Sequence, residues 1–437
     1  MADSPKVVVR DVFQHAVDQS KLWGSCVSNP LIGEVRDGYS LGIEGWVVSR
    51  GSRAVAIECI CGGVLVRRVH VNLVRPDIQA LFPQAADALK SGFRMSLSAL
   101  NFPTLASIYL QIVLEDGELL PLSVITLERA TIAPTNPPVL TPILLSTLGR
   151  TGSTWAMRLL GEHPQLVAYR PFEYEPRFTH YWLDVFATLA EPRSYYQAIE
   201  AELYDETWWV GRGRSVEPPD PEEPQLRRWF GSDSVIAAAD FCLSRIDSFY
   251  GEVRGLQSKA SAQYFVEKCW PSQHLTMLMG ELYPAGKEIV LVRDFRDMVC
   301  SILSFNRSRG FASFGRELVA SDEEFVRKLR ESATQLLDHW KRQSERAHLL
   351  RYEDLILQPQ ATLQSMFEYL EVEATPELIE RVLKQAKGLT LDAQKEHSTS
   401  KDASSSVGRW RKDLSDDLKR ICRESFGDIL DEFGYER

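Results

Sequence analysis

A glycine-bearing turn between an apolar run and a helical pattern is the most constraining feature of the sequence. Residues 143–155 read Ile-Leu-Leu-Ser-Thr-Leu-Gly-Arg-Thr-Gly-Ser-Thr-Trp. The apolar start predicts a buried strand, and Ser153 or Thr154 is a candidate cap for the helix that follows. The two glycines allow a turn in which free amides, the positive end of the helix and Arg150 face one point. This arrangement favours a doubly charged oxyanion.

The turn lacks the lysine of a nucleotide triphosphate loop. That motif requires Gly, four residues and then Gly-Lys-Ser or Gly-Lys-Thr, whereas Ser153 directly follows Gly152 in this chain. Glycine-rich strand-to-helix turns also occur in many α/β proteins as simple junctions. The turn alone therefore leaves two interpretations open, an anion site and an ordinary junction.

Residues 40–127 have the alternating pattern of antiparallel strands. Gly62-Gly63 and Asp116-Gly117 are hairpin signals, and each stands between two runs of strand-forming residues. Such spacing predicts a small all-β sandwich with its own core.

The pattern changes after a proline-rich stretch. Residues 133–142 contain four prolines and no helical or strand period, so they predict a stiff linker. Beyond the linker, long helical patterns separate apolar strands, which predicts a parallel sheet flanked by helices. The expected strands are 143–147, 288–292 and 348–350. We thus expect a β-sandwich domain with an N-terminal extension over 1–132, a linker over 133–142 and an α/β domain over 143–437.

Composition narrows the classes of partner. The formal net charge of -10 argues against a broad basic face for nucleic acid. The seven cysteines form no Cys-x-x-Cys pair, and no clear His/Cys cluster is evident, so we expect reduced thiols and no metal site. The first residues lack a signal-peptide pattern, and no apolar run reaches about 18 residues. We therefore expect a soluble, cytoplasmic protein without an integral membrane segment.

A second strand-to-helix junction carries an arginine and a serine. Residues 288–305 begin with an apolar strand, Arg293 stands at the turn, and Ser301 follows about two helical turns later. A bidentate arginine together with a hydroxyl suits a second phosphate. The alternative is that the charged run 293–297 (Arg-Asp-Phe-Arg-Asp) forms surface ion pairs.

Three ordered motifs together resemble the sulfotransferase family. They are the turn around Arg150, the Val-Arg-Asp-x-Arg-Asp run with Ser301, and Leu-Arg-Tyr-Glu-Asp-Leu at 350–355. The resemblance covers about residues 140–437 and implies a P-loop-like fold. It also implies transfer of a sulfuryl group from 3′-phosphoadenosine 5′-phosphosulfate (PAPS) to a hydroxyl or amine, with 3′,5′-adenosine bisphosphate (PAP) as product.

The resemblance also implies a set of cofactor contacts. The segment 404–414 resembles the family's flexible stretch that folds over the nucleotide. By motif, the implied contacts are Arg150, Thr151, Gly152, Ser153 and Thr154 for the 5′-phosphosulfate, Arg293 and Ser301 for the 3′-phosphate, and Trp155, Tyr352, Ser406 and Arg409 as further cofactor-binding residues.

A lysine motif suggests how the leaving group is stabilised. Phe-Val-Glu-Lys at 265–268 resembles the Val-Glu-Lys segment of bacterial members and of the tyrosylprotein branch, although Cys-Trp-Pro replaces Thr-Pro after it. The resemblance implies that Lys268 lies near the bridging oxygen and, with Arg150, belongs to the catalytic set. The alternative is a solvated lysine on a surface strand.

The base is expected just after the first helix. The tyrosylprotein-like branch has a catalytic glutamate in this region, which implies Glu173, with Glu175 and His180 as alternatives. We interpret His163, at the helix exit, as structural. The implied reaction is in-line displacement, in which Glu173 deprotonates the acceptor while Arg150 and Lys268 stabilise charge.

The acceptor is less constrained. Residues 174–209 are rich in aromatic side chains, which suit either an acceptor pocket or helix packing. The Gly45-Trp46 strand and the stretch from Arg75-Pro76-Asp77 to Gly92-Phe93 resemble sandwich modules fused to bacterial carbohydrate-modifying enzymes. This favours a glycan or glycolipid acceptor.

Several alternatives stay open. A small metabolite or a tyrosine in a peptide could be the acceptor instead. The chain could also be a nucleotide-binding scaffold without turnover, or a phosphotransferase that uses magnesium and ATP. A homodimer is left open.

Overall fold

The computed structural model of the protein describes residues 6–191, 223–388 and 404–436. The chain divides into two compact units, one made of residues 1–137 and 183–242, and one made of residues 138–182 and 243–437. The chain passes from one unit to the other three times: between Pro137 and Pro138, within α4 (Phe178–Ala190) and within α7 (Ser234–Leu256).

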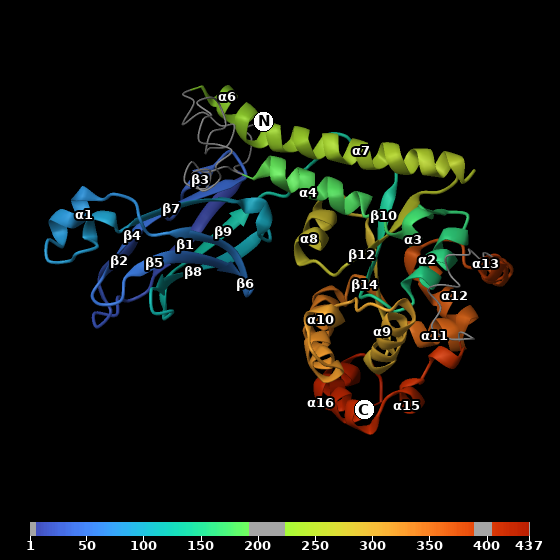
Figure 1. Ribbon diagram of the computed structural model, residues 1–437. Coiled ribbons are helices and arrows are strands. Elements are labelled where there is room, and N and C mark those ends of the chain that lie inside the picture. Colours follow the sequence, from blue (N-terminus) through green and yellow to red (C-terminus); the bar gives the residue numbers. More distant parts are fainter. Residues whose placement is uncertain (1–5, 192–222, 389–403, 437) are drawn as a thin grey trace. The chain divides into compact units, whose positions relative to one another are not determined.

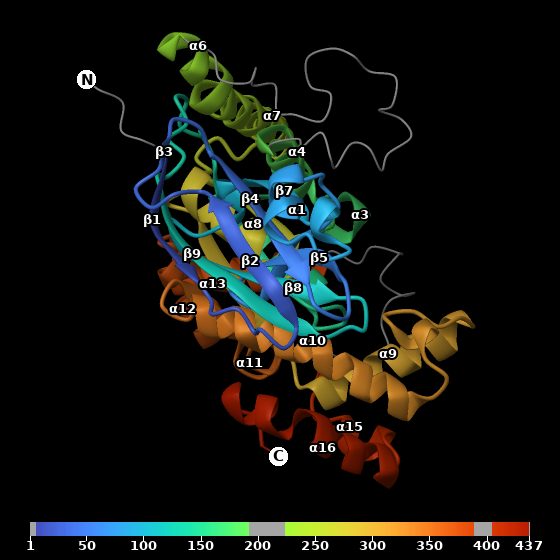
Figure 2. The same cartoon turned by 90° about the vertical axis from the view of Figure 1, so that its left-hand side faces the viewer.

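Two antiparallel sheets form the core of the first unit, and their strands can be followed in Figure 2. The larger sheet has the strand order β3-β1-β9-β8-β5-β6, and the smaller has the order β2-β4-β7. Side chains from both sheets, such as Ile43, Phe93 and Ile108, share one apolar core. The predicted β-sandwich is therefore confirmed. Its elements are β1 (Val7–Gln14), β2 (Leu22–Asn29), β3 (Val35–Arg36), β4 (Ser40–Ser49), β5 (Ala54–Cys61), β6 (Val64–His70), α1 (Pro76–Leu81), β7 (Gly92–Ser98), β8 (Leu105–Leu114) and β9 (Leu119–Arg129).

Both predicted hairpins are present. β5 pairs with β6 across Gly62 and Gly63, and β8 pairs with β9 across Asp116 and Gly117. These three glycines have φ values of 56°, 78° and 87°, which lie in the left-handed region that favours glycine. The turn residues thus determine the strand pairing here.

A five-stranded parallel sheet forms the centre of the second unit (Figure 1). Its strand order is β11-β12-β10-β13-β14, so the strand that precedes the glycine-bearing turn lies in the middle. The predicted helix-flanked parallel sheet is confirmed. The strands are β10 (Thr141–Thr147), β11 (Leu166–Ala168), β12 (Tyr264–Cys269), β13 (Lys287–Val292) and β14 (Ala347–Arg351).

Helices cover both faces of this sheet. Ile289 and Leu291 of β13 pack into one apolar core, whereas Val290 and Val292 pack into another, as expected for a strand buried on both faces. The first core includes side chains of α2, α11, α12 and α13, and the second includes those of α9, α10 and α16. The remaining bounds are α2 (Ser153–Glu162), α3 (Pro171–Tyr174), α6 (Pro224–Arg228), a π-helical turn (Trp229–Asp233), α8 (Gln273–Leu282), α9 (Phe295–Arg309), α10 (Asp322–Gln343), α11 (Tyr352–Leu357), α12 (Pro359–Leu370), α13 (Pro376–Gly388), α15 (Trp410–Asp413) and α16 (Asp416–Glu432), with short 3₁₀ turns at Ala88–Lys90, Ala99–Asn101, Arg316–Leu318 and Ser404–Ser406.

The parallel register brings the sequence motifs to one edge of the sheet. Leu145 of β10 lies beside Lys268 of β12, and Thr147 of β10 lies beside Leu291 of β13. Val292 of β13 in turn lies beside Arg351 of β14. The turns that follow β10, β13 and β14 therefore leave the sheet at its carboxyl edge, where α/β proteins bind ligands.

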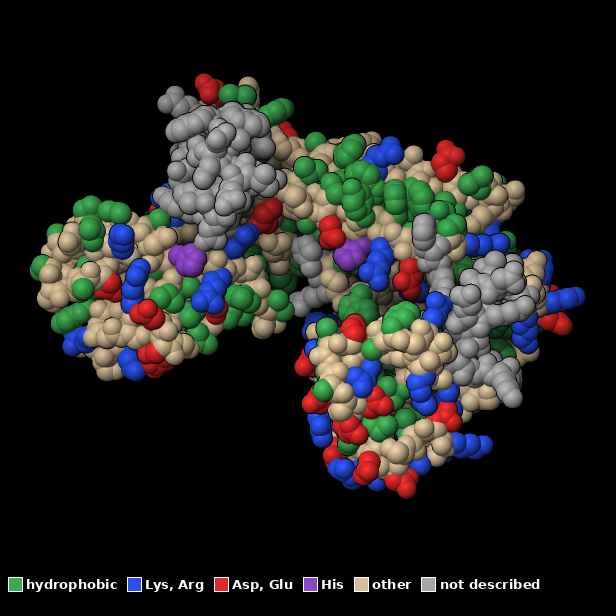
Figure 3. All heavy atoms as spheres, in the orientation of Figure 1, with side chains coloured by type: hydrophobic (Ala, Val, Ile, Leu, Met, Phe, Trp, Pro, Cys, Tyr) green, Lys and Arg blue, Asp and Glu red, His purple; other side chains and the backbone are tan. Residues whose placement is uncertain are grey.

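Charged side chains of both signs are mixed on the face of the second unit drawn in Figure 3. Over α10 and α16, Arg330 pairs with Asp428 and Lys341 pairs with Glu432. In the described parts of the chain, every helix is too short or too polar to cross a membrane.

Candidate active site

The turn after β10 adopts an unusual backbone conformation. Arg150 and Gly152 have φ values of 66° and 88°. The left-handed positions of the turn are therefore Arg150 and Gly152, whereas Gly149 is not left-handed. Gly152 is the N-cap of α2 and caps it without a side chain. Neither Ser153 nor Thr154 is the cap that the sequence led us to expect, because both already lie inside the first turn of the helix.

Hydroxyl groups brace this turn from below. Thr151 Oγ1 donates to the carbonyl of Leu148 at 3.0 Å, and Thr147 Oγ1 lies 2.6 Å from Thr151 Oγ1. Thr147 Oγ1 also donates to the carbonyl of Leu291 on the neighbouring strand at 3.0 Å. Thr151 is fully buried, so its hydroxyl orders the turn.

Both glycines of the turn are needed for close packing. A Cβ added to Gly149 would lie 2.8 Å from the Phe314 ring, and one added to Gly152 would lie 2.3 Å from the ring of Tyr352. Tyr352 is the first residue of α11, after β14. The third sequence motif therefore contacts the first directly.

Arg293 and Ser301 both reach the turn. Nη1 of Arg293 donates to the carbonyl of Arg150 at 3.1 Å, and Nε of Arg150 donates to Ser301 Oγ at 3.3 Å. The Arg293 guanidinium lies over the Tyr352 ring, 4.6 Å from its centroid. The structure therefore brings together Arg150, Arg293, Ser301 and Tyr352, which come from three separate motifs.

Two donors at this site have no partner among the described residues. Nε of Arg293 is buried and contacts no acceptor, and the same holds for the indole Nε1 of Trp155 in the first turn of α2. A buried donor without an acceptor costs about 1–3 kcal/mol. Such donors are consistent with a bound ligand that supplies the acceptors.

The 404–413 segment closes over the same residues. Nη2 of Arg293 donates to the carbonyl of Ser406 at 2.8 Å, and the hydroxyls of Ser406 and Tyr352 lie 2.9 Å apart. Arg409 pairs with Asp413 on its own helical turn at 2.7 Å. Ser406 is thus in contact with the cluster, and Arg409 forms an ion pair within the segment.

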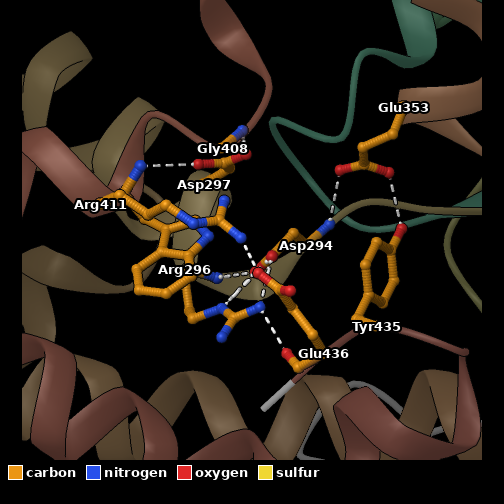
Figure 4. Close-up of polar contacts among 9 residues, drawn as sticks. Asp294, Arg296, Asp297, Glu353, Gly408, Arg411, Tyr435 and Glu436 are labelled. Atoms are coloured by element: carbon orange, nitrogen blue, oxygen red, sulfur yellow. Dashed lines mark hydrogen bonds and ion pairs between the residues drawn. The ribbon is translucent and has the colours of Figure 1, made fainter. Parts of the chain in front are cut away.

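The charged run 293–297 is buried, so the surface ion-pair interpretation was wrong. Asp294 and Arg296 do pair, at 2.8 Å, but each side chain is less than a tenth exposed. Asp297 is fully buried and accepts hydrogen bonds from the backbone N–H groups of Gly408 and Trp410, at 2.7 and 2.9 Å (Figure 4). Burial raises the pKa of Asp297 to about 6.

Glu353 connects the turn before α9 to the end of the chain. Its carboxylate accepts from the backbone N–H of Asp294 at 3.0 Å and from the hydroxyl of Tyr435 at 2.7 Å (Figure 4). Burial raises the pKa of Glu353. This carboxylate therefore orders the loop that carries Arg293.

Lys268 is buried, and its partner is Glu175. Only 8% of the Lys268 side chain is exposed, so the surface-strand alternative was wrong. Its ammonium forms an ion pair with the Glu175 carboxylate, which also lies 4.0 Å from Arg177. The backbone of Glu173 lies in α3, but its side chain lies outside what the structure describes. His180 lies in the first turn of α4.

His163 has a structural role. Its Nδ1 accepts from the backbone N–H of Gln165 at 3.1 Å, so Nε2 carries the proton and donates to the carbonyl of Glu373 at 2.9 Å. Burial lowers the pKa of His163, which favours this neutral form. Both ring nitrogens are therefore used, as we expected.

Glu267, the residue before Lys268, is a second buried carboxylate. Both of its oxygens accept from the backbone N–H of Thr179, at 3.1 and 2.9 Å, in the first turn of α4. Burial raises the pKa of Glu267 to about 7. This carboxylate fixes the start of α4, where the positive end of the helix favours an acceptor.

The aromatic side chains that the structure describes take part in packing. The rings of Phe178 and Phe249 are stacked at 4.1 Å, and Phe178 meets Trp182 edge-on at 6.3 Å. Five other members of this stretch lie outside the described residues: Tyr195, Tyr196, Tyr204, Trp208 and Trp209.

Sequence reasoning missed the structural partners of the site. In the sequence, Asp297 and Glu353 stand only within motifs, and Glu267 stands only next to Lys268. Each is an acidic residue in an otherwise apolar or motif-bearing stretch, and this pattern is the sequence feature that could have indicated a buried carboxylate. Within the described ranges, no group of three or more His, Cys, Asp or Glu residues could hold a metal ion.

Comparison with known proteins gives one family match. A model described as "Sulfotransferase family" matches residues 142–376. No protein of curated function matches the chain. The solved sulfotransferase domain from the curacin biosynthetic pathway is 19% identical, with a TM-score of 0.38 and coverage of 69% of this chain and 99% of that one. Sulfotransferase STF9 from Mycobacterium avium is 16% identical (TM-score 0.36; coverage 68% and 78%), and a mouse sulfotransferase complexed with PAP is 11% identical (TM-score 0.35; coverage 66% and 84%).

The buried Glu267 gives a prediction about pH. Because its pKa rises to about 7 from an ordinary 4.5, the folded state binds more protons than the unfolded state between these values. The free energy of unfolding should therefore fall as pH rises through this window, by on the order of 3 kcal/mol from this group. Glu267→Gln should remove that decrease, as measured by urea unfolding at pH 5 and pH 8. The exposed Glu380→Gln on α13 serves as the matched control, and equal slopes for wild type and Glu267→Gln would contradict the assignment.

Proposed function

The chain belongs to the sulfotransferase family, whose model matches more than half of its residues, and we propose that it transfers a sulfuryl group from PAPS to an acceptor hydroxyl. The observation that carries the cofactor proposal is the meeting of Arg150, Arg293 and Ser301 at the sheet's carboxyl edge. The Arg293 guanidinium binds the backbone of the turn that carries Arg150, and two arginines at one turn favour a dianionic or doubly phosphorylated ligand.

The residues present fit such a cofactor. Nε of Arg293 is a buried donor that lacks an acceptor, and a phosphate oxygen supplies one. Gly152 lets the Tyr352 ring pack against the turn. The first backbone amides of a helix lack partners within the helix, so those at the start of α2 are donors for an anion. The residues proposed to hold PAPS are Arg150, Thr151, Gly152, Ser153 and Thr154 at the 5′-phosphosulfate, Arg293 and Ser301 at the 3′-phosphate, and Trp155, Tyr352, Ser406 and Arg409 around them.

The bound cofactor supplies an activated sulfuryl group. Arg150 and the turn amides provide positive charge at the anion site, and they act mainly by orientation and electrostatics. The Lys268 ammonium is buried, and its ion pair with Glu175 fixes its position. We assign to it the stabilisation of negative charge that grows on the leaving phosphate. Arg150 and Lys268 are therefore the proposed electrostatic catalysts.

Glu173 is the proposed base. One of its carboxylate oxygens would take the proton from the acceptor hydroxyl, whose oxygen would form the new bond to sulfur while the bond from sulfur to the bridging oxygen breaks and PAP leaves. Glu175 is the alternative, because the structure has its carboxylate in an ion pair with Lys268. In our assignment Glu175 holds Lys268 in position, and Glu173 is the base.

Nucleotide binding tests the cofactor assignment. PAP at 100 times its dissociation constant should raise the free energy of unfolding by about 2.7 kcal/mol, and Arg150→Ala should abolish most of that increase. The exposed Arg342→Ala on α10 should keep it. Thermal unfolding with and without PAP measures the effect, and a wild-type protein that PAP does not stabilise would rule the cofactor out. Transfer that requires ATP and magnesium would point to a phosphotransferase, and binding without transfer would point to a scaffold.

Two carboxylate variants separate the candidate bases. Glu173→Gln should keep PAP affinity and slow transfer by about 10²- to 10⁴-fold, because general base catalysis is lost. Glu175→Gln removes charge next to Lys268 and should slow transfer less. Single-turnover rates with saturating PAPS compare the two variants. Near-normal transfer in Glu173→Gln with a large loss in Glu175→Gln would move the base to Glu175, and normal transfer in both would direct attention to His180→Ala.

For the acceptor we propose a glycan, a glycolipid or another small hydroxyl compound. The support is the likeness of the Gly45-Trp46 and Arg75-Pro76-Asp77 stretches to modules of carbohydrate-modifying enzymes. Labelled sulfate from PAPS should therefore appear in the glycan or glycolipid fraction of a host lysate, and in wild type but not in Arg150→Ala. Label that appears only in tyrosine of peptides would overturn this choice and would leave the sulfuryl transfer intact.

A further inference from the structure

Asp297 is a buried carboxylate that the reaction described above does not use. It lies on the first turn of α9, four residues after Arg293, and it is fully buried. Its two oxygens bind different residues, since Oδ2 accepts from the N–H of Gly408 and Oδ1 accepts from the N–H of Trp410 (Figure 4). One side chain on α9 therefore holds the backbone of the 404–413 segment at two points.

The two points lie next to the residues of the segment that we propose for the cofactor. Gly408 and Trp410 flank Arg409 and come just after Ser406. Gly408 has a φ value of 67°, a left-handed conformation that favours glycine. With this conformation, the backbone N–H groups of Gly408 and Trp410 both point toward the Asp297 carboxylate. The position of Asp297 thus determines where this stretch of backbone lies.

Side chains of the segment add to the same attachment. Two guanidinium groups lie over the Trp410 ring, that of Arg296 at 3.9 Å and that of Arg411 at 4.6 Å from the ring centroid. Arg296 also donates to the carbonyl of Glu436 at 2.7 Å, so that the end of the chain supports it (Figure 4). These contacts orient the tryptophan, whereas the two hydrogen bonds to Asp297 attach the backbone N–H groups of Gly408 and Trp410 to α9.

Resting on the proposed function, we propose that Asp297 is a positioning residue that holds the 404–413 segment closed over the nucleotide site. The closed segment supplies the Ser406 carbonyl to Nη2 of Arg293 and the Ser406 hydroxyl to Tyr352. With Nη1 and Nη2 engaged, Arg293 keeps Nε as its buried donor without a partner. Asp297 therefore acts on the cofactor through Ser406 and Arg293, and it does not touch the cofactor itself.

The charge state of Asp297 controls this attachment. The ionised carboxylate accepts at both oxygens, whereas a protonated carboxyl has a hydroxyl at one of them and loses an acceptor for one amide. Its pKa is raised to about 6, mainly by burial and then by Asp294, whereas the two backbone N–H groups and Arg293 lower it. The attachment should weaken as pH falls through this value.

Several charged and titratable groups surround this carboxylate. Those within electrostatic reach of Asp297 or of its neighbour Cys300 are Arg293 and Asp294 in the turn before α9, Cys300 in α9, Arg409 and Asp413 in the segment, and Cys422 in α16. The thiol pKa values of Cys300 and Cys422 are raised to about 12, so these groups stay neutral at pH 5 to 8. Asp297 is thus the buried group of this set with a pKa near 6.

The test compares full-length wild type with Asp297→Asn. The asparagine has one acceptor oxygen, and its NH₂ group faces the other backbone N–H, so the closed form should become less populated. We expect the dissociation constant for PAP and the KM for PAPS to rise about tenfold to a hundredfold, which is the loss of a hydrogen bond to a charged group. The kcat at saturating PAPS should change little, because the base and Lys268 are intact.

A matched control and two further measurements separate this role from general stability. Asp428→Asn makes the same chemical change where Asp428 accepts from Arg330 at 2.7 and 2.8 Å, between α10 and α16, and it should leave PAP affinity unchanged. Without nucleotide, the amides of Gly408 and Trp410 should exchange hydrogen faster in Asp297→Asn than in wild type. In wild type alone, PAP affinity should fall as pH drops through about 6, and this needs no variant to fold.

The outcomes are distinguishable. If wild type does not bind PAP, the proposed function fails, and the role of Asp297 fails with it. If wild type binds PAP while Asp297→Asn binds equally well and exchanges these amides at the wild-type rate, only the role of Asp297 is overturned. A flat pH profile of PAP affinity in wild type would have the same consequence.

Discussion

The hydrogen bond from Arg293 to the carbonyl of Arg150 joins the turns that follow β10 and β13. It forms because β10 and β13 are adjacent and parallel, so that the turns after them leave the sheet side by side. The left-handed backbone at Arg150 turns its carbonyl toward Arg293 while its side chain reaches Ser301. Gly152 then allows Tyr352 to pack against the same turn. The adenine nucleotide site that we propose depends on this junction.

Three buried carboxylates hold backbone segments around the proposed site. Glu353 accepts from the loop that carries Arg293, Asp297 accepts from the 404–413 segment, and Glu267 accepts from the start of α4. Each accepts backbone N–H groups, which stabilise an ionised carboxylate, and each has a raised pKa because burial opposes the charge. Burial of each carboxylate costs desolvation free energy, and its hydrogen bonds to backbone N–H groups hold a loop or a helix start in one position.

Much of this architecture could be predicted from the sequence. The hairpin glycines and the alternating strands indicated the sandwich, and the apolar strands followed by glycine and arginine indicated the parallel sheet and its ligand-binding edge. Two strands were missed, β11 and β12. β11 has only three residues, and the residues of β12 carry a lysine motif for which the sequence offered only a surface strand as the alternative. The cap of α2 was also misassigned, because only the backbone conformation shows that Gly152 begins the helix.

The sequence by itself determined which chemical groups are available, because spacing within one turn or one helix places Arg150 near the loop amides and Arg293 near Ser301. Only the tertiary structure decided which of these groups meet. Contacts between residues far apart in the chain, such as Asp297 with Gly408 or Lys268 with Glu175, depend on strand order and helix packing. Local periodicity carries no information about those long-range neighbours. The charged run at 293–297 is buried because the 404–413 segment packs against it, and that contact is a feature of the tertiary structure.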